Sequence, residues 1–322
     1  MLKNEGNFMD KKEHDFFRVN VLTYDRHFIE YFNNSTDNEQ IGELHSVYTK
    51  TINFSDNKKD MYTIGTKRID NSPYTVILDT ETLDFSNFQF EPETPIFKLK
   101  DKIIIGDKIE ICFNRDSALW DSDIKAVKRI DEDIVLNHIE HFNQVIRNSG
   151  SYGGCKYYYL KNYLQTENDK PSLTEKELCK RTESFICNIK AGNINEEIIA
   201  PLIGFGAGLT PSGDDFITGF LSVTNIISIN YTNKIKSELV HSIDINKIST
   251  TDVSRQMLLT AINGEAREYI INFILSFLNK NEKEFLLSLN NLLSIGYSSG
   301  TDISIGAVTA FIIIINNSDM EE

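Results

Sequence analysis

Residues 204–219 read GFGAGLTPSGDDFITG, where a glycine-rich loop gives way to a long apolar run. Glycine occupies every second position from 204 to 208, which disfavours regular helix or strand and permits positive φ angles. Thr210-Pro211-Ser212 then has the form of a helix start, because a hydroxyl side chain can cap a helix and proline suits its first turn. The stretch therefore predicts a loop followed by a helix over 214–229.

The junction between this loop and the helix has the chemistry of a small-anion site. It presents unpaired N–H donors and the positive end of the helix dipole. It is not a Walker A loop, because no Gly-Lys-Ser/Thr follows. It is not a dinucleotide fingerprint either, because the match to G-x-G-x-x-G fails and no parallel βαβ pattern surrounds it. We predict that an anion or substrate is bound by Gly206, Gly208, Thr210, Ser212 and Gly213.

Two adjacent carboxylates, Asp214 and Asp215, follow the loop. Two unit charges ~4 Å apart repel by roughly 4 kcal/mol at an effective dielectric constant of about 20. The dipole of one helix stabilises a negative charge at its N-terminus by only about 0.3–1 kcal/mol. A bare carboxylate should therefore not face a bare phosphate here. Either a cation such as Mg²⁺ bridges the two aspartates to the anion, or they accept N–H bonds from an amide, urea or ammonium group. The plainer alternative is that both residues simply favour the first turn of a helix.

Two later segments have the same pattern of hydroxyl and acidic residues before a helical run. They are STTDVS at 249–254 and SSGTD at 298–302. Each can be an ordinary helix cap. Three such starts in one helical domain can also converge on a pocket. On that reading the site gains Ser254, Ser299, Gly300 and Asp302.

The chain changes character near residue 120. Before it, short runs of β-branched and aromatic residues alternate with turn residues, over 42–54, 61–66, 74–78, 103–105 and 108–113. After it, helical spacing or length appears over 130–148, 174–190, 214–229, 250–263, 266–279, 282–295 and 302–315. We predict an α+β protein. An N-terminal extension (1–40) with a short helix over 24–32 precedes an antiparallel β-rich domain, either a sheet or a small barrel (41–119), and a mainly α-helical domain (120–322).

Composition limits the classes of partner. A formal charge of −14 over 322 residues, with no local basic cluster, argues against binding to nucleic acid or to an anionic membrane. The most apolar stretch, 303–315, is too short to span a bilayer. The N-terminus lacks the apolar core of a signal peptide, and the four cysteines show no CxxC pairing, so we expect a cytoplasmic protein. His138 and His141 have metal-ligand spacing, but nearby charges favour an exposed helix face.

The motif GFGAGLTPSGDDFITG resembles the signature of the AllH-type subunit family of oxamate carbamoyltransferase. Supporting blocks are LHSVY at 44–48 with Ile52-Asn53, Trp120-Asp121, the residues Thr250, Thr251 and Ser254, and SSGTD at 298–302. The resemblance runs from about residue 41 to the C-terminus and leaves 1–40 unexplained. The serine-threonine-arginine-threonine phosphate motif of the aspartate and ornithine transcarbamoylases is absent.

The resemblance implies a role in anaerobic allantoin and purine degradation, in the interconversion of oxalurate plus phosphate with oxamate plus carbamoyl phosphate. It also implies other carbamoyltransferase subunits as partners, and a carbamate kinase that uses the product. Carbamoyl transfer needs a phosphate cradle and donors for charge on the carbamoyl oxygen. The loop with Thr210 and Ser212 suits the cradle, and Asp214 or Asp215 suits binding of the NH₂ group or general base catalysis.

Two other functions compete with carbamoyl transfer. The chain could be a non-catalytic ligand-binding or scaffold subunit of a multi-subunit complex. It could also be a metal-dependent enzyme that acts on a small phosphate ester through Asp214 and Asp215, with Mg²⁺ as the ion.

Overall fold

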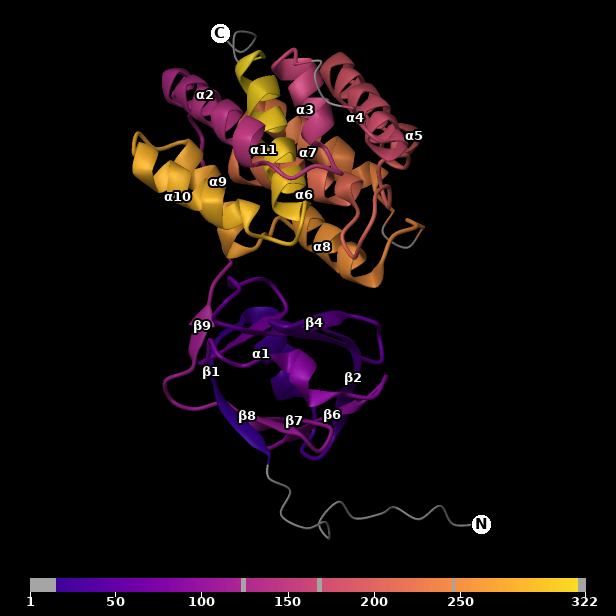
Figure 1. Ribbon diagram of the computed structural model, residues 1–322, viewed down its shortest axis with the longest axis vertical. Helices are drawn as coiled ribbons and strands as arrows, with labels where there is room; N and C mark the ends of the chain where they lie inside the picture. The colour runs from indigo at the N-terminus through magenta and orange to yellow at the C-terminus, as the bar shows by residue number, and fades with distance from the viewer. Residues whose placement is uncertain (1–15, 123–125, 167–169, 245–246, 318–322) are drawn as a thin grey trace. The chain divides into compact units, whose positions relative to one another are not determined.

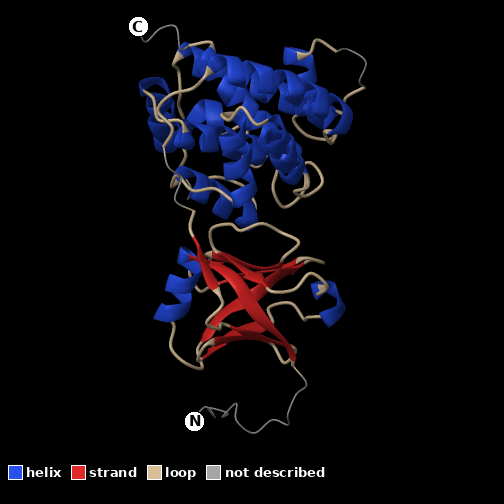
Figure 2. Ribbon diagram, turned by 90° about the vertical axis from the view of Figure 1, so that its left-hand side faces the viewer, coloured by secondary structure: helices blue, strands red, loops and turns tan. Residues whose placement is uncertain are grey.

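The computed structural model describes residues 16–122, 126–166, 170–244 and 247–317. The chain divides into two compact units, with the boundary between Asp121 and Ser122. The first is the barrel unit and the second is the helical unit. Figure 2 shows strands gathered in one unit and helices dominating the other, which confirms the predicted α+β class.

The barrel unit is built from one sheet in the strand order β5-β4-β3-β2-β6-β7-β8-β1-β9. β1 also pairs with β5, which closes the sheet into a barrel, the second of the two predicted forms. Most pairings are antiparallel, while β1–β8, β1–β9 and β4–β5 are parallel. The strands are β1 (Phe17–Asp25), β2 (Gln40–Val47), β3 (Thr51–Ser55), β4 (Met61–Thr66), β5 (Thr75–Leu78), β6 (Pro95–Leu99), β7 (Lys102–Ile105), β8 (Ile109–Cys112) and β9 (Ala118–Trp120).

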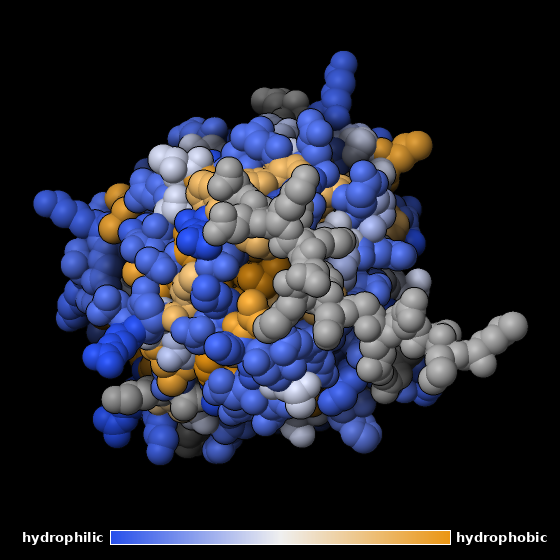
Figure 3. Space-filling model, turned by 90° about the horizontal axis from the view of Figure 1, so that it is seen from below, coloured by the Kyte–Doolittle hydropathy of each residue, from blue (hydrophilic) through white to orange (hydrophobic). Residues whose placement is uncertain are grey.

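The barrel core is apolar and aromatic, and α1 (Arg26–Asn34) contributes to it. Phe28 of this helix packs edge-on against Phe54 and Tyr62. Asp25 caps the helix, because its carboxylate accepts the Phe28 N–H at 2.9 Å. On the molecular face in Figure 3, hydrophilic side chains predominate and hydrophobic ones are interspersed among them, because a folded protein cannot cover all of its apolar surface.

The start of the β-rich part differs from the prediction. β1 and α1 lie within the segment 1–40 that was expected to be an extension, and β1 closes the barrel. The alternation in β1 is weak, because only Val21 and Asp25 of its nine residues are buried. Its partners β5 and β8 are also far along the chain, so no local hairpin signal marks it. The short helix predicted over 24–32 begins two residues later.

The helical unit contains every helix predicted after residue 120, with ends that differ by a few residues. α3, α5 and α7 were not predicted. The helices are α2 (Glu132–Ser149), α3 (Lys156–Tyr163), α4 (Leu173–Ala191), α5 (Glu196–Ile199), α6 (Ser212–Ile226), α7 (Asn230–Ser242), α8 (Asp252–Ile262), α9 (Glu268–Phe277), α10 (Glu282–Leu293) and α11 (Ser299–Ile315).

α6 and α11 form the centre of the helical unit (Figure 1). Both are buried on nearly every side, as expected of helices that are apolar all round. Two glycines permit their close contact. A Cβ atom at Gly219 would lie 2.0 Å from the Ile303 carbonyl oxygen, and one at Gly306 would lie 2.1 Å from the Phe216 carbonyl oxygen. The two helices therefore meet backbone to backbone.

His138 is not on an exposed face, contrary to the prediction. Its side chain is 1% exposed, stacks on Phe285 and bonds the Phe277 carbonyl through Nδ1 at 3.0 Å. It is a core histidine with a satisfied ring nitrogen. Among the residues that the structure describes, no helix combines the length and apolarity needed to cross a lipid bilayer.

Candidate functional site

The glycine-rich loop before α6 has the predicted irregular backbone. Gly204, Gly206 and Gly208 have φ angles of +72°, +135° and +96°, in the left-handed region that favours glycine. The loop is anchored at its first glycine, whose N–H donates to the Asp214 carboxylate at 2.7 Å. A Cβ atom at Gly204 would lie 2.1 Å from the Ser249 carbonyl oxygen, so the loop also presses against the segment before α8.

The loop presents a row of open N–H donors. Within the described parts of the chain, the N–H groups of 206–210 and of Ser212 have no protein acceptor. Pro211 precedes the helix and gives it no side-chain cap. Residues 207–209 are exposed. These N–H groups, which we call the N–H cradle, are therefore available to an anion at the positive end of α6.

Asp214 joins the loop to the start of α8. One oxygen accepts the Gly204 N–H, and the other accepts the hydroxyls of Ser254, at 2.6 Å, and of Thr250. Burial raises the pKa of Asp214, and the Ser254, Thr250 and Gly204 donors partly offset that rise. Both oxygens of Asp214 thus have protein donors, which fits a structural role in holding two chain segments together.

The start of α11 lies against the same loop. The hydroxyls of Thr210 and Ser299 bond one another at 2.8 Å. Asp302, one turn into α11, is fully buried and accepts the Cys155 N–H at 2.6 Å through Oδ1. The Ser212 hydroxyl lies beside it. The structure therefore brings together the three helix starts at residues 212, 252 and 299.

Asp215 and Asp302, which we call the carboxyl pair, are the unusual groups of this region. Both are fully buried. Within the described residues, neither oxygen of Asp215 has a donor at full hydrogen-bond geometry, nor does Oδ2 of Asp302, although the hydroxyls of Ser299 and Thr210 lie close enough to lower the pKa of Asp215. Burial, followed by the nearby charge of Asp302, raises the pKa of Asp215 well above its ordinary value. Burial raises the pKa of Asp302 to about 7, against donors that include the Cys155 N–H.

Two of the predicted binding residues serve backbone packing. The Gly213 N–H donates to the Phe205 carbonyl at 2.9 Å, and the Gly300 N–H donates to the Ile295 carbonyl at 3.0 Å. A Cβ atom at Gly213 would lie 2.0 Å from the Leu202 carbonyl oxygen, and one at Gly300 would lie 1.9 Å from that of Leu292. Both glycines are needed for close approach of chain segments, and their N–H groups are used within the protein.

Sequence reasoning missed the loop at 150–155, which packs on α11. Besides the Cys155 bond to Asp302, the Ser151 N–H donates to the Thr301 hydroxyl at 3.0 Å. A Cβ atom at Gly154 would lie 2.2 Å from an Asp302 oxygen. Burial, then nearby Asp302, raises the pKa of the Cys155 thiol well above its usual range, which favours the protonated thiol. The Gly153-Gly154 pair was the signal available for this loop.

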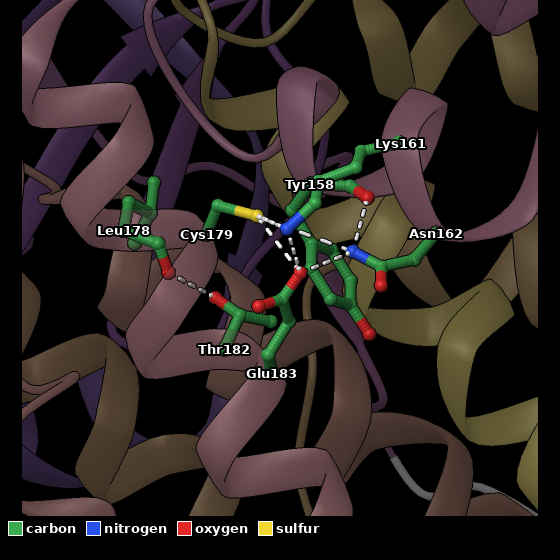
Figure 4. Close-up of polar contacts among 7 residues, drawn as sticks. All are labelled: Tyr158, Lys161, Asn162, Leu178, Cys179, Thr182 and Glu183. Carbon is green, nitrogen blue, oxygen red and sulfur yellow. Dashed lines mark hydrogen bonds and ion pairs between the residues drawn. The ribbon is translucent and has the colours of Figure 1, made fainter. Parts of the chain in front are cut away.

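A second polar cluster joins α3 to α4 (Figure 4). Glu183 accepts a hydrogen bond from Lys161 at 2.6 Å, one from Asn162 at 3.0 Å and one from the Cys179 thiol at 3.3 Å. Burial, with help from Glu183, raises the pKa of Cys179 to about 12. The thiol therefore stays protonated, and the cluster holds two helices together. α4 begins with a capping box formed by Ser172 and Glu175.

The raised pKa of Asp302 predicts how stability depends on pH. Its folded-state pKa of about 7 exceeds the ordinary value of 3.8, so the folded chain keeps a proton that the unfolded chain has lost between these values. The contribution of Asp302 is thus fully present below about pH 4 and is lost as pH rises towards 7. In chelator-treated buffer, Asp302→Asn should flatten the fall in unfolding free energy across this window by about 1 kcal/mol per pH unit. Urea unfolding at several pH values measures this slope, and parallel curves for the two proteins would contradict it.

Two family models match the chain. The one described as oxamate carbamoyltransferase subunit AllH matches residues 202–311, which include the loop, Asp214, the carboxyl pair and the starts of α8 and α11. The other, the AllH family N-terminal domain, matches residues 20–118, which include most of the barrel unit. No solved structure matches the chain.

Proposed function

The chain belongs to the AllH family of oxamate carbamoyltransferase subunits, and we propose that its helical unit supplies the phosphate-binding part of a carbamoyl-transfer site. The proposed reaction interconverts oxalurate plus phosphate with oxamate plus carbamoyl phosphate, within anaerobic allantoin and purine degradation. Other carbamoyltransferase subunits complete the enzyme, and the complex works in the cytoplasm.

The observation that carries this proposal is the N–H cradle. Phosphate and carbamoyl phosphate are anions that need several donors fixed in advance. The donors of residues 206–210 and Ser212 have no other acceptor in the described chain. They lie at the start of α6, where the helix dipole also favours negative charge. The hydroxyls of Thr210 and Ser299 add side-chain donors at its edge.

The two aspartates of the motif receive different parts in the proposal. The oxygens of Asp214 are occupied by three donors, so Asp214 holds the cradle in shape. The oxygens of Asp215 have no donor at full hydrogen-bond geometry in the described residues, so Asp215 is the carboxyl group that remains for the chemistry. Because a bare carboxylate and a bare phosphate repel one another, the suitable partners of Asp215 are a carbamoyl NH₂ group or a cation.

Gly206→Ala is the sharpest test of the cradle. The added methyl group would lie 2.5 Å from the Ser212 nitrogen and so block that donor. A hydrogen bond to a charged group contributes about 1.5–3 kcal/mol, so the Kd for phosphate or carbamoyl phosphate should rise about 10- to 100-fold. Isothermal titration measures this directly. The matched control is Gly192→Ala, which also has positive φ, at +72°, but has no atom within 4 Å of the new methyl group. Equal affinities in the two variants would contradict the cradle.

The catalytic half of the proposal needs an activity assay. The chain alone, and the chain with its partner subunits, should be tested for phosphorolysis of oxalurate by measuring carbamoyl phosphate. We expect activity with the partners that falls in Gly206→Ala and persists in Gly192→Ala. Full activity of the partner subunits without this chain would overturn its proposed place in the active site.

A further inference from the structure

We propose that the carboxyl pair, Asp215 and Asp302, binds one hard divalent cation of the Mg²⁺ class directly behind the N–H cradle. The cation site stands on the geometry of the helical unit alone. Its effect on phosphate rests in addition on the proposed function.

The oxygens of the carboxyl pair are poorly satisfied within the protein. Both oxygens of Asp215 and Oδ2 of Asp302 are buried, and the hydroxyls beside them lie outside full hydrogen-bond geometry. The carboxyl oxygens also make no hydrogen bond to one another, so a proton shared directly between the two side chains does not satisfy them. Buried carboxyl groups in proteins hold a proton, are paired with donors or coordinate metal ions. Three such oxygens at two neighbouring helix starts can serve as ligands of one cation, which would replace the proton that burial otherwise favours.

The donor atoms select the class of ion. The hydroxyls of Thr210 and Ser299 lie beside Asp215, and the hydroxyl of Ser212 lies beside Asp302. The Cys155 thiol also lies beside Asp302 but donates to the Ser212 carbonyl at 3.7 Å. The remaining atoms are oxygens, and Mg²⁺ is commonly held by one or two carboxylates with other oxygen ligands. Within the described residues, no group of three His, Cys, Asp or Glu side chains forms a metal cluster, so the site does not suit zinc.

The charge balance selects a divalent ion. Three carboxylates lie where the starts of three helices meet: Asp214 and Asp215 belong to α6 and Asp302 to α11, while α8 contributes the Ser254 hydroxyl. Each helix start carries the equivalent of about half a positive charge, so the ionised region holds a net charge of about −1.5 and repels a phosphate. A monovalent ion leaves that balance negative, whereas a divalent ion makes it slightly positive. The ion would thus let the carboxyl pair and the N–H cradle lie side by side.

A carbamoyl NH₂ group fits the carboxyl pair less well than an ion does. Both side chains are fully buried, and the bonded hydroxyls of Thr210 and Ser299 stand beside Asp215. A carbamoyl group would need an opening beside these buried oxygens large enough for several atoms. A single ion needs no such opening, and it can remain in place through each catalytic cycle.

The test is a titration of the full-length, chelator-treated protein with Mn²⁺, with free Mn²⁺ followed by electron paramagnetic resonance and Mg²⁺ added as competitor. The wild type should bind one Mn²⁺ per chain. Asp215→Asn and Asp302→Asn should each weaken binding at least tenfold. The control is Asp25→Asn, which makes the same charge change at a buried carboxyl in the barrel unit and should bind like the wild type. If an Asn variant does not fold, Ser299→Ala takes its place and should weaken binding at least threefold.

A second titration, of phosphate with and without Mg²⁺, separates the two proposals. Mn²⁺ binding that is lost in the variants, with no effect of Mg²⁺ on phosphate, supports the cation site and contradicts the link to the anion. Phosphate binding without any stoichiometric Mn²⁺ site supports the cradle and overturns the cation site. Unchanged Mn²⁺ binding in both aspartate variants also overturns it.

Discussion

Replacing Gly306 by alanine is expected to destabilise the helical unit by about 2–4 kcal/mol, because overpacking a close contact costs at least this much when backbone must move. The new methyl group would lie 2.1 Å from the Phe216 carbonyl oxygen, which belongs to the backbone of α6 and cannot rotate away. The same change in an unobstructed helix would stabilise the protein by about 1 kcal/mol. Gly219→Ala should behave alike, since its methyl group would lie 2.0 Å from the Ile303 carbonyl oxygen.

Urea unfolding followed by circular dichroism measures these losses. Ser237→Ala, on an exposed position of α7, serves as the control for alanine itself and should change stability by less than about 0.5 kcal/mol. If Gly306→Ala matches or exceeds the wild type in stability, the backbone-to-backbone contact of α6 and α11 is wrong.

Asp214→Ala should lower the free energy of unfolding by about 3–5 kcal/mol. Removing one partner from a buried charged network leaves the other buried groups without a hydrogen-bond partner. The Gly204 N–H and the hydroxyls of Thr250 and Ser254 would lose their acceptor. The loop would no longer be tied to α8, so phosphate binding should be lost with stability. Asp214→Asn keeps an oxygen for the Gly204 N–H, so its loss in unfolding free energy should be about half that of the alanine variant. Thermal unfolding and phosphate titration of both variants test this. An alanine variant that is as stable as the wild type but inactive would show that Asp214 is catalytic.

The sequence patterns pointed to three helix starts that the structure places together, but not to how the aspartates are divided between them. Asp214 and Asp215 do not form one pair, because successive helical residues point about 100° apart. Asp214 therefore faces α8, and Asp215 faces the partner that lies far along the chain, Asp302. Hydroxyl and acidic residues before a helical run are a local signal. Which hydroxyl meets which carboxylate depends on packing, and a single sequence does not record it.

Glycine was the most ambiguous residue. Gly206 and Gly208 have open N–H groups, as predicted, whereas Gly213 and Gly300 are used for close packing. Both uses follow from the missing Cβ atom, and both occur next to helix starts. In the barrel unit the difficulty was different. β1 is recognisable only through strands that lie more than fifty residues away, so the closed barrel could be named as an alternative but not assigned.

The N–H cradle affects which substitutions the loop can accept during evolution. Recognition by backbone groups does not depend on the side chains attached to them, and residues 207–209 are exposed. Under the proposed function, exchanging Ala207 or Leu209 for other residues should therefore cost little anion affinity and should change only what surrounds the bound group. The loop can acquire new specificity one substitution at a time, while the helices behind it remain under strict steric constraint.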